Sequence, residues 1–139
     1  MLALTIYLAG FAALGLVSLF AWAKGGALER QAAVVIAGAW LLSAVVPLSG
    51  RASPAWSLVA IDVLLLIYLS YLAAFSQRRW PIAAAGFQLL IVANHFAFAR
   101  NLALEQWAYF TAYYIWSWGV LGALAVGAAR TLRRRQTNG

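Results

Sequence analysis

The feature that most constrains this chain is a series of five long apolar stretches that fill almost all of its 139 residues. They cover residues 2–23, 32–49, 55–75, 80–99 and 106–129, and only short segments separate them. Each stretch has about the 17–25 residues that a helix needs to cross a hydrocarbon core about 30 Å thick. The sequence therefore predicts an all-α integral membrane protein, a bundle of five transmembrane helices joined by short loops.

Composition excludes most other classes of protein. The chain is 65% hydrophobic and only 9% charged, whereas a soluble domain is about 25% charged. No hydrophilic segment has room for a catalytic or nucleotide-binding domain, so residues 1–139 are expected to form one transmembrane domain with a basic tail at 130–139. Cysteine is absent, and there is one histidine and one methionine. A metal site is therefore not expected, and no spacing of a nucleophile and a base points to an enzyme.

The basic residues predict how the helices are oriented. If the N-terminus lies outside, eight of the ten Lys and Arg residues fall on the side of the C-terminus. These are Lys24, Arg30, Arg78, Arg79, Arg130, Arg133, Arg134 and Arg135. Only Arg51 and Arg100 fall on the other side, and positively charged loops stay in the cytoplasm, so we expect the N-terminus outside and the C-terminus inside. The tail arginines are expected to lie against anionic lipid headgroups, and nucleic acid is not an expected partner despite the net charge of +7.

The acidic residues are divided between loops and one helix. Glu29 and Glu105 are expected in loops, where each either pairs with a neighbouring arginine, Arg30 or Arg100, or is solvated. Such surface pairs contribute about 0–1 kcal/mol. Asp62 is the one acidic residue well inside a predicted helix, so its burial requires an explanation.

Two further patterns concern helix ends and helix packing. Four tryptophans fall at predicted helix borders: Trp22, Trp56, Trp80 and Trp107. Indole rings prefer the headgroup level, so these four are expected to mark the membrane interfaces. Gly119, Ala123 and Gly127 recur every fourth residue in the last stretch. Such a stripe lets helices approach closely, either within the bundle or against other subunits.

Asp62 and His95 lie at a common depth in the predicted bundle. At 1.5 Å per residue, Asp62 is about 10 Å below the outer surface in the third stretch, and His95 is about 6–8 Å below it in the fourth. A charged Asp at this depth costs a few kcal/mol unless it is protonated, paired or turned towards the bundle. We therefore expect the two side chains to point inward and to meet, directly or through a water.

Four more polar residues surround this pair in the predicted bundle: Gln88, Asn94, Tyr109 and Tyr113. Gln88 lies two turns deeper than His95 on the same helix face, and the two tyrosines share one stripe of the last stretch. Three interpretations of the cluster are open. It is a polar clasp that sets helix register, a proton or solute pathway, or the contact of a haem, another pigment or a quinone with the single imidazole of His95.

The short loops, the small-residue stripe and the many aromatic residues favour an accessory function. We expect a small polytopic subunit that packs against and helps to assemble or shape a larger inner-membrane complex, energy-transducing or pigment-bearing. The alternatives are a small transporter or proton-conducting protein that uses Asp62 and His95, and a protein that binds a tetrapyrrole or quinone cofactor through His95. The segment 77–95, with QRRWP, FQL and NH in order, resembles small bacterial inner-membrane proteins. We carry no activity or site over from this resemblance, and the expected location is a bacterial inner membrane.

Overall fold

The computed structural model describes residues 2–45, 56–100 and 106–139, and these ranges contain five α-helices. The helices are α1 (Leu2–Lys24), α2 (Ala27–Val45), α3 (Trp56–Phe75), α4 (Trp80–Arg100) and α5 (Gln106–Thr137). Each is long and apolar enough to span a membrane, and no β-strand occurs in the described ranges. The predicted all-α class and the number of long apolar helices are therefore confirmed.

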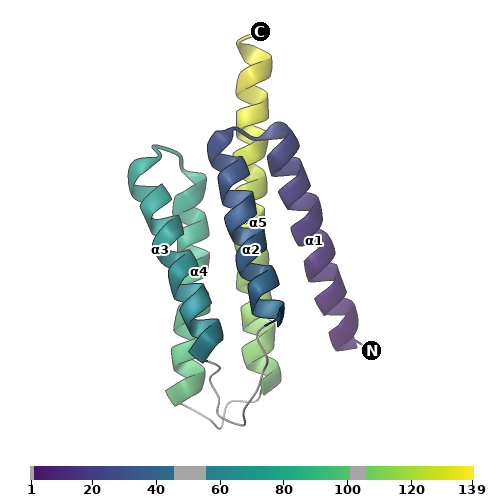
Figure 1. The fold of residues 1–139 in the computed structure, drawn as a ribbon, viewed down its shortest axis with the longest axis vertical. Coiled ribbons are helices and arrows are strands. Elements are labelled where there is room, and N and C mark those ends of the chain that lie inside the picture. The colour runs from purple at the N-terminus through teal and green to yellow at the C-terminus, as the bar shows by residue number, and fades with distance from the viewer. Residues whose placement is uncertain (1, 46–55, 101–105) are drawn as a thin grey trace.

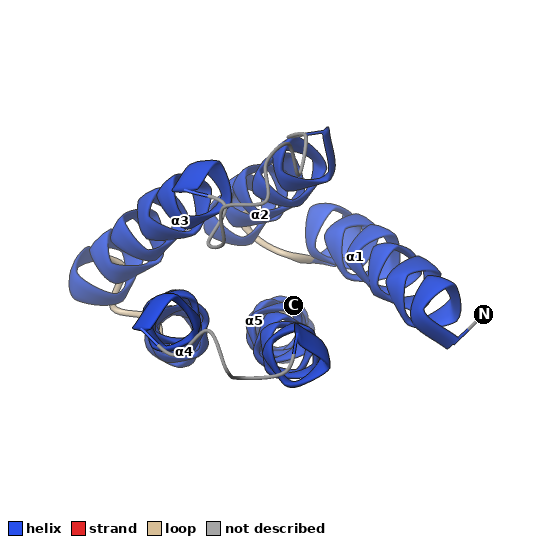
Figure 2. Ribbon diagram, turned by 90° about the horizontal axis from the view of Figure 1, so that it is seen from below, coloured by secondary structure: helices blue, strands red, loops and turns tan. Residues whose placement is uncertain are grey.

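The helices form two layers (Figure 2). Helices α3, α2 and α1 lie in a row, while α4 and α5 lie along one side of that row, with α5 beside both α4 and α1. The most extensive packing is between α4 and α5, followed by that between α3 and α4. Helix α1 begins and helix α5 ends at opposite ends of the bundle (Figure 1).

Two helices are longer than the sequence predicted. Helix α2 begins at Ala27 instead of residue 32, so Glu29 belongs to its first turn and not to a loop. Helix α5 continues to Thr137 instead of ending at 129, and its last turns extend beyond the other helices (Figure 1). Residues 130–137 contain Arg, Leu and Gln but neither Gly nor Pro, so nothing ends the helix where its apolar part ends. Residues 46–49 of the predicted second span, Pro47 included, lie outside the described residues.

Apolar side chains fill the interior and also cover the exterior. Ile36, Leu69 and Leu124, from three different helices, are completely buried. Large apolar side chains such as Leu16 and Phe75 point outward and are mostly exposed. Monomeric proteins in water rarely expose extended apolar surfaces, so this exterior suits a multi-pass membrane protein.

The small-residue stripe of α5 packs inside the bundle. A Cβ atom at Gly119 would lie 2.6 Å from the ring of Phe87, and one at Gly127 would lie 2.4 Å from Cδ1 of Trp80. Ala123, between the two glycines, is also buried. The glycines allow two aromatic rings of α4 to lie directly on the backbone of α5. Of the two expected uses of the stripe, the structure shows packing within the bundle.

We expect Gly127→Ala to lower the free energy of unfolding by about 1–3 kcal/mol, because the added methyl group overpacks the buried Trp80 ring. Gly122→Ala is the matched control in the same helix, because a Cβ there would meet nothing within 4 Å. This control should be neutral or stabilising by about 1 kcal/mol. The measurement is reversible unfolding in mixed micelles, followed by circular dichroism. Equal losses in the two variants would contradict the packing described here.

Candidate functional site

The buried faces of α3 and α4 bring three polar side chains together. On α3, Asp62 shares the buried face with Val59 and Leu65. On α4, Gln88 and His95 lie seven residues apart on the buried face that packs against α3. Asp62 is 5% exposed, and Gln88 and His95 are each 1% exposed, so all three need partners within the protein.

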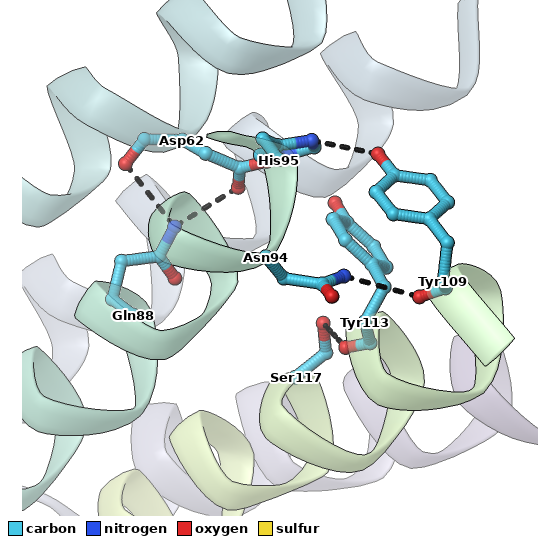
Figure 3. Close-up of polar contacts among 7 residues, drawn as sticks. All are labelled: Asp62, Gln88, Asn94, His95, Tyr109, Tyr113 and Ser117. Atoms are coloured by element: carbon cyan, nitrogen blue, oxygen red, sulfur yellow. Dashed lines mark hydrogen bonds and ion pairs between the residues drawn. The ribbon is translucent and has the colours of Figure 1, made fainter. Parts of the chain in front are cut away.

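Direct hydrogen bonds join these three residues (Figure 3). Nε2 of His95 lies 2.7 Å from Oδ2 of Asp62. The amide nitrogen of Gln88 donates to Oδ1 of Asp62 at 2.9 Å and to its backbone carbonyl oxygen at 3.1 Å. Both carboxylate oxygens are therefore occupied, and the Gln88 amide fixes the orientation of the carboxyl group towards His95.

Tyr109, in the second turn of α5, extends this chain of hydrogen bonds. Its hydroxyl oxygen lies 2.6 Å from Nδ1 of His95. The ring of Phe98 stacks on the Tyr109 ring with centroids 4.6 Å apart, and the Asn94 amide donates to the backbone carbonyl of Tyr109 at 3.1 Å. Residues on α4 thus hold both the ring and the backbone of Tyr109 in place. The result is a continuous carboxyl–imidazole–phenol chain across three helices.

Tyr113 lies one turn further along α5. Its ring centroid is 5.7 Å from that of His95, with an angle of 61° between the two ring planes. Its hydroxyl points towards the Asp62 and His95 side of the cluster (Figure 3). Ser117 donates to the backbone carbonyl of Tyr113 at 2.7 Å, so its hydroxyl is bonded within the helix. The structure therefore brings together all six residues of the predicted polar cluster.

The hydrogen bonds of His95 limit what its imidazole can bind. Both ring nitrogens are bonded, one to Asp62 and one to Tyr109. A metal ion or a haem iron needs a free nitrogen lone pair, so ligation would break one of these bonds. The His95–Asp62 contact is the only one between a basic and an acidic side chain in the described part of the chain, and it is an ion pair only when His95 is protonated. The two residues are therefore each other's main electrostatic partner in a setting where a lone charge is costly.

A cavity of about 500 Å³ adjoins the polar cluster. It lies at the end of the bundle where α1 and α5 begin and α2 ends, and its lining is mainly aromatic. The aromatic residues around it are Tyr7, Phe11, Trp40, Tyr109, Phe110, Tyr113 and Tyr114. Tyr109 and Tyr113 belong both to this wall and to the polar cluster. A largely apolar ligand in the cavity would thus lie next to one end of the hydrogen-bonded chain.

Glu29 is a second buried acidic residue, and the sequence prediction missed it. Its side chain is 0% exposed. One carboxylate oxygen accepts the backbone N–H of Gly26 at 2.8 Å, and the other accepts the indole N–H of Trp80 at 3.2 Å. Neither expected environment of Glu29 is found, because the side chain is buried and not solvated, and Arg30 donates to the carbonyl of Trp22 at 2.8 Å instead of pairing with Glu29. The missed signal is the spacing Gly26-x-x-Glu29, in which a glutamate at the third helical position caps its own helix.

The four border tryptophans do not behave alike. Trp22, Trp56 and Trp107 are largely exposed, as a position at a membrane interface requires. Trp80 is only 4% exposed and donates to Glu29. Trp80 still lies at a helix border, as the first residue of α4, but its ring packs against Gly127 instead of facing outward.

The arginines of the predicted basic side gather at the end of the bundle opposite the aromatic cavity. Arg30 lies in the first turns of α2, Arg78 and Arg79 follow α3, and the remaining four lie on the last turns of α5. Those four are Arg130, Arg133, Arg134 and Arg135. Glu105, the expected partner of Arg100, lies outside the described residues.

Comparison of the chain with protein-family models, with curated proteins and with solved structures finds no match. In the ranges that the structure describes, no group of three His, Cys, Asp or Glu side chains could hold a metal ion. The site combines an aromatic cavity with a relay of three hydrogen-bonding groups, the buried Asp62 and His95 and the partly buried Tyr109.

Proposed function

We propose that this chain is a multi-pass membrane protein that binds a ring compound of the quinone class in the aromatic cavity, and that binding is coupled to uptake or release of a proton by the Asp62–His95–Tyr109 chain. The observation that carries the proposal is the unbroken chain from Asp62 through His95 to Tyr109, a residue that lines the cavity. This function corresponds to the cofactor-binding interpretation of His95 and adds a role for the Asp62 carboxyl group. We assign to the protein the binding of a ligand with uptake or release of a proton, and no enzyme activity.

The relay offers the ligand two different hydrogen-bonding partners. With one proton on the imidazole, held towards Asp62, Nδ1 of His95 accepts the Tyr109 proton and the phenol oxygen faces the ligand as an acceptor. With two protons on the imidazole, Nδ1 donates to Tyr109 and the phenol proton is free to bond a ligand oxygen. One proton taken up by the relay thus changes Tyr109 from acceptor to donor. Quinones and quinols present these complementary groups, a carbonyl oxygen and a hydroxyl.

A quinone fits this site better than a tetrapyrrole does. Axial ligation of a haem iron needs a free imidazole nitrogen, and both nitrogens of His95 already have partners at 2.7 and 2.6 Å. A quinone needs only an aromatic slot and a hydrogen-bonding group at its edge. The cavity walls supply the first, and Tyr109 supplies the second.

The polar chain supports local proton exchange better than conduction through the bundle. The relay lies near one end of the helices, and the buried face of α3 continues beyond Asp62 with Leu65, Leu69 and Leu72. Proton pathways through membranes use chains of polar side chains or water. Three leucines in succession on this face do not supply one.

The proposed setting is a bacterial inner membrane, with the N-terminus outside and the arginine-rich end of α5 in the cytoplasm. The cavity and relay would then lie towards the outer surface. A subunit of a larger energy-transducing complex stays compatible with this function. The small-residue stripe of α5 now supports such a subunit less, because aromatic rings of the same chain already pack against Gly119 and Gly127.

We expect Tyr109→Phe to weaken the binding of a short-chain ubiquinone about three- to tenfold, because one hydrogen bond contributes about 0.5–1.5 kcal/mol. The ring remains to stack on Phe98, so packing is preserved. Tyr114→Phe is the matched control, since Tyr114 also lines the cavity but does not bond His95. Quenching of tryptophan fluorescence by the quinone in lipid nanodiscs measures binding, with Trp40 as the reporter in the cavity wall.

The wild-type protein should also take up or release protons when the quinone or the quinol binds, as measured with a pH indicator in weak buffer. Tyr109→Phe should remove this exchange, and Tyr114→Phe should retain it. Saturable binding with the same affinity and the same proton exchange in all three proteins would contradict the relay. Quenching that does not saturate in the wild type, or that is unchanged when Trp40 is replaced by phenylalanine, would contradict the cavity as the binding site.

A further inference from the structure

A second hollow lies at the opposite end of the bundle, where three segments distant in sequence meet. It has a volume of about 490 Å³. Its wall includes one residue of the α1–α2 turn, one of the α3–α4 loop and three of α5: Gly26, Arg78, Thr131, Arg134 and Arg135. The extension of α5 beyond residue 129 is what brings its two arginines to the same hollow as Arg78.

The arginines around this hollow have no anionic partner in the described part of the chain. Arg135 donates to the backbone carbonyl of Gly25 at 3.3 Å, which anchors its side chain beside the turn. Among the described residues, no carboxylate forms an ion pair with Arg78, Arg134 or Arg135. The acidic residue of this turn, Glu29, is fully buried and bonded to Gly26 and Trp80 instead. Arg134 and Arg135 are exposed and Arg78 is half-buried, so all three guanidinium groups are accessible to an anion from water.

A hydroxyl group in the same wall also lacks a partner. Thr131 is 7% exposed, and its Oγ1 is buried without a hydrogen bond. Buried hydroxyl groups in proteins are nearly always bonded. Thr131 is thus a lining residue of the hollow with an unpaired hydroxyl in the described structure.

We propose that this hollow binds one phosphate group, held between Arg78 on one side and Arg134 and Arg135 on the other. A phosphate offers several oxygens to the planar guanidinium donors, and bidentate Arg–phosphate bonds are among the strongest hydrogen bonds in proteins. The phosphate comes from the headgroup of an anionic lipid or from free phosphate. This site is separate from the aromatic cavity and goes beyond the proposed function, and its occupant would tie the α3–α4 loop to the end of α5.

The test compares two double variants with the same loss of charge. Arg78→Gln/Arg134→Gln removes two arginines of the hollow, whereas Arg79→Gln/Arg133→Gln removes their exposed neighbours, which do not line it. Each protein is reconstituted in phosphatidylcholine vesicles that contain phosphatidic acid as a minor component. Native mass spectrometry after gentle release then counts the phosphatidic acid molecules retained on each chain.

We expect the wild type and the Arg79/Arg133 variant to retain phosphatidic acid, and the Arg78/Arg134 variant to retain about tenfold less, as the loss of charge-assisted bonds implies. A second arm adds inorganic phosphate before release. Displacement of the lipid identifies a site that accepts free phosphate, and retention identifies the lipid headgroup as the occupant. Equal losses in both double variants would overturn the proposal, because diffuse attraction of lipid to positive charge would then account for binding. Retention of phosphatidic acid no greater than that of phosphatidylcholine by the wild type would also overturn it.

Discussion

Replacing His95 with leucine is expected to lower the free energy of unfolding by about 3–5 kcal/mol, because it leaves the Asp62 carboxylate buried with only neutral partners. The Asp62→Leu variant should lose less, since a neutral imidazole can remain buried beside Tyr109. The double variant should lose less than the sum of the two single changes. Reversible unfolding of the four proteins in mixed micelles, with increasing SDS, measures this coupling.

The size of the His95→Leu effect separates two physical descriptions of the pair. Hydrogen bonds between membrane helices contribute about 0.6 kcal/mol on average and up to about 2 kcal/mol. A loss in that range would mean that Asp62 becomes a neutral acid once its partner is gone. A loss of about 3–5 kcal/mol would mean that the carboxylate stays charged. Strictly additive effects in the cycle would contradict the contact itself, because residues that touch share an interaction energy.

Glu29→Ala is expected to have the second large effect, a loss of about 2–5 kcal/mol in the free energy of unfolding. The substitution removes the acceptor of two buried donors, the Gly26 backbone N–H and the Trp80 indole N–H. Each unsatisfied donor costs about 1–3 kcal/mol. Because Trp80 packs on Gly127, the change should also loosen the contact between α4 and α5. Chemical unfolding followed by circular dichroism measures the loss.

Two further variants separate the roles of the Glu29 carboxyl group. Glu29→Gln retains one acceptor oxygen, so it should lose about half as much as Glu29→Ala if hydrogen bonding dominates. In Trp80→Phe, one of the two donors is absent, so adding Glu29→Ala to that background should cost less than it costs in the wild type. An equal cost in both backgrounds would show that the Glu29–Trp80 hydrogen bond does not contribute to stability.

Much of the polar cluster could be predicted from helix depth alone. The five apolar stretches set the number of helices, and antiparallel neighbours place residues at calculable depths from a shared surface. Asp62 in the third helix and His95 in the fourth are at similar depths by this count, and the structure places them 2.7 Å apart. The seven-residue spacing of Gln88 and His95 also predicted their common face, on which both contact Asp62 or its backbone.

Helix ends were predicted less well, because hydropathy does not report where hydrogen bonding of the backbone stops. Glu29 and Arg30 ended the apolar pattern and were therefore expected in a loop, although a capping glutamate is typical of a first helical turn. The same reasoning ended the last helix at 129, whereas the structure continues it to Thr137. Both errors concern charged residues that are good helix formers.

The sequence by itself determined the class of protein, because five apolar stretches of sufficient length have few alternatives to membrane-crossing helices. It also determined which residues were candidates for a polar cluster, since ionisable groups are rare among so many apolar ones. Only the tertiary structure decided the rotation of each helix about its axis, because helices that are apolar on every face carry no periodic signal for it. That rotation turns Trp80 inward onto Gly127 and Glu29. It also places Tyr109 between His95 and the cavity, and gathers Arg78 and Arg134 around one hollow.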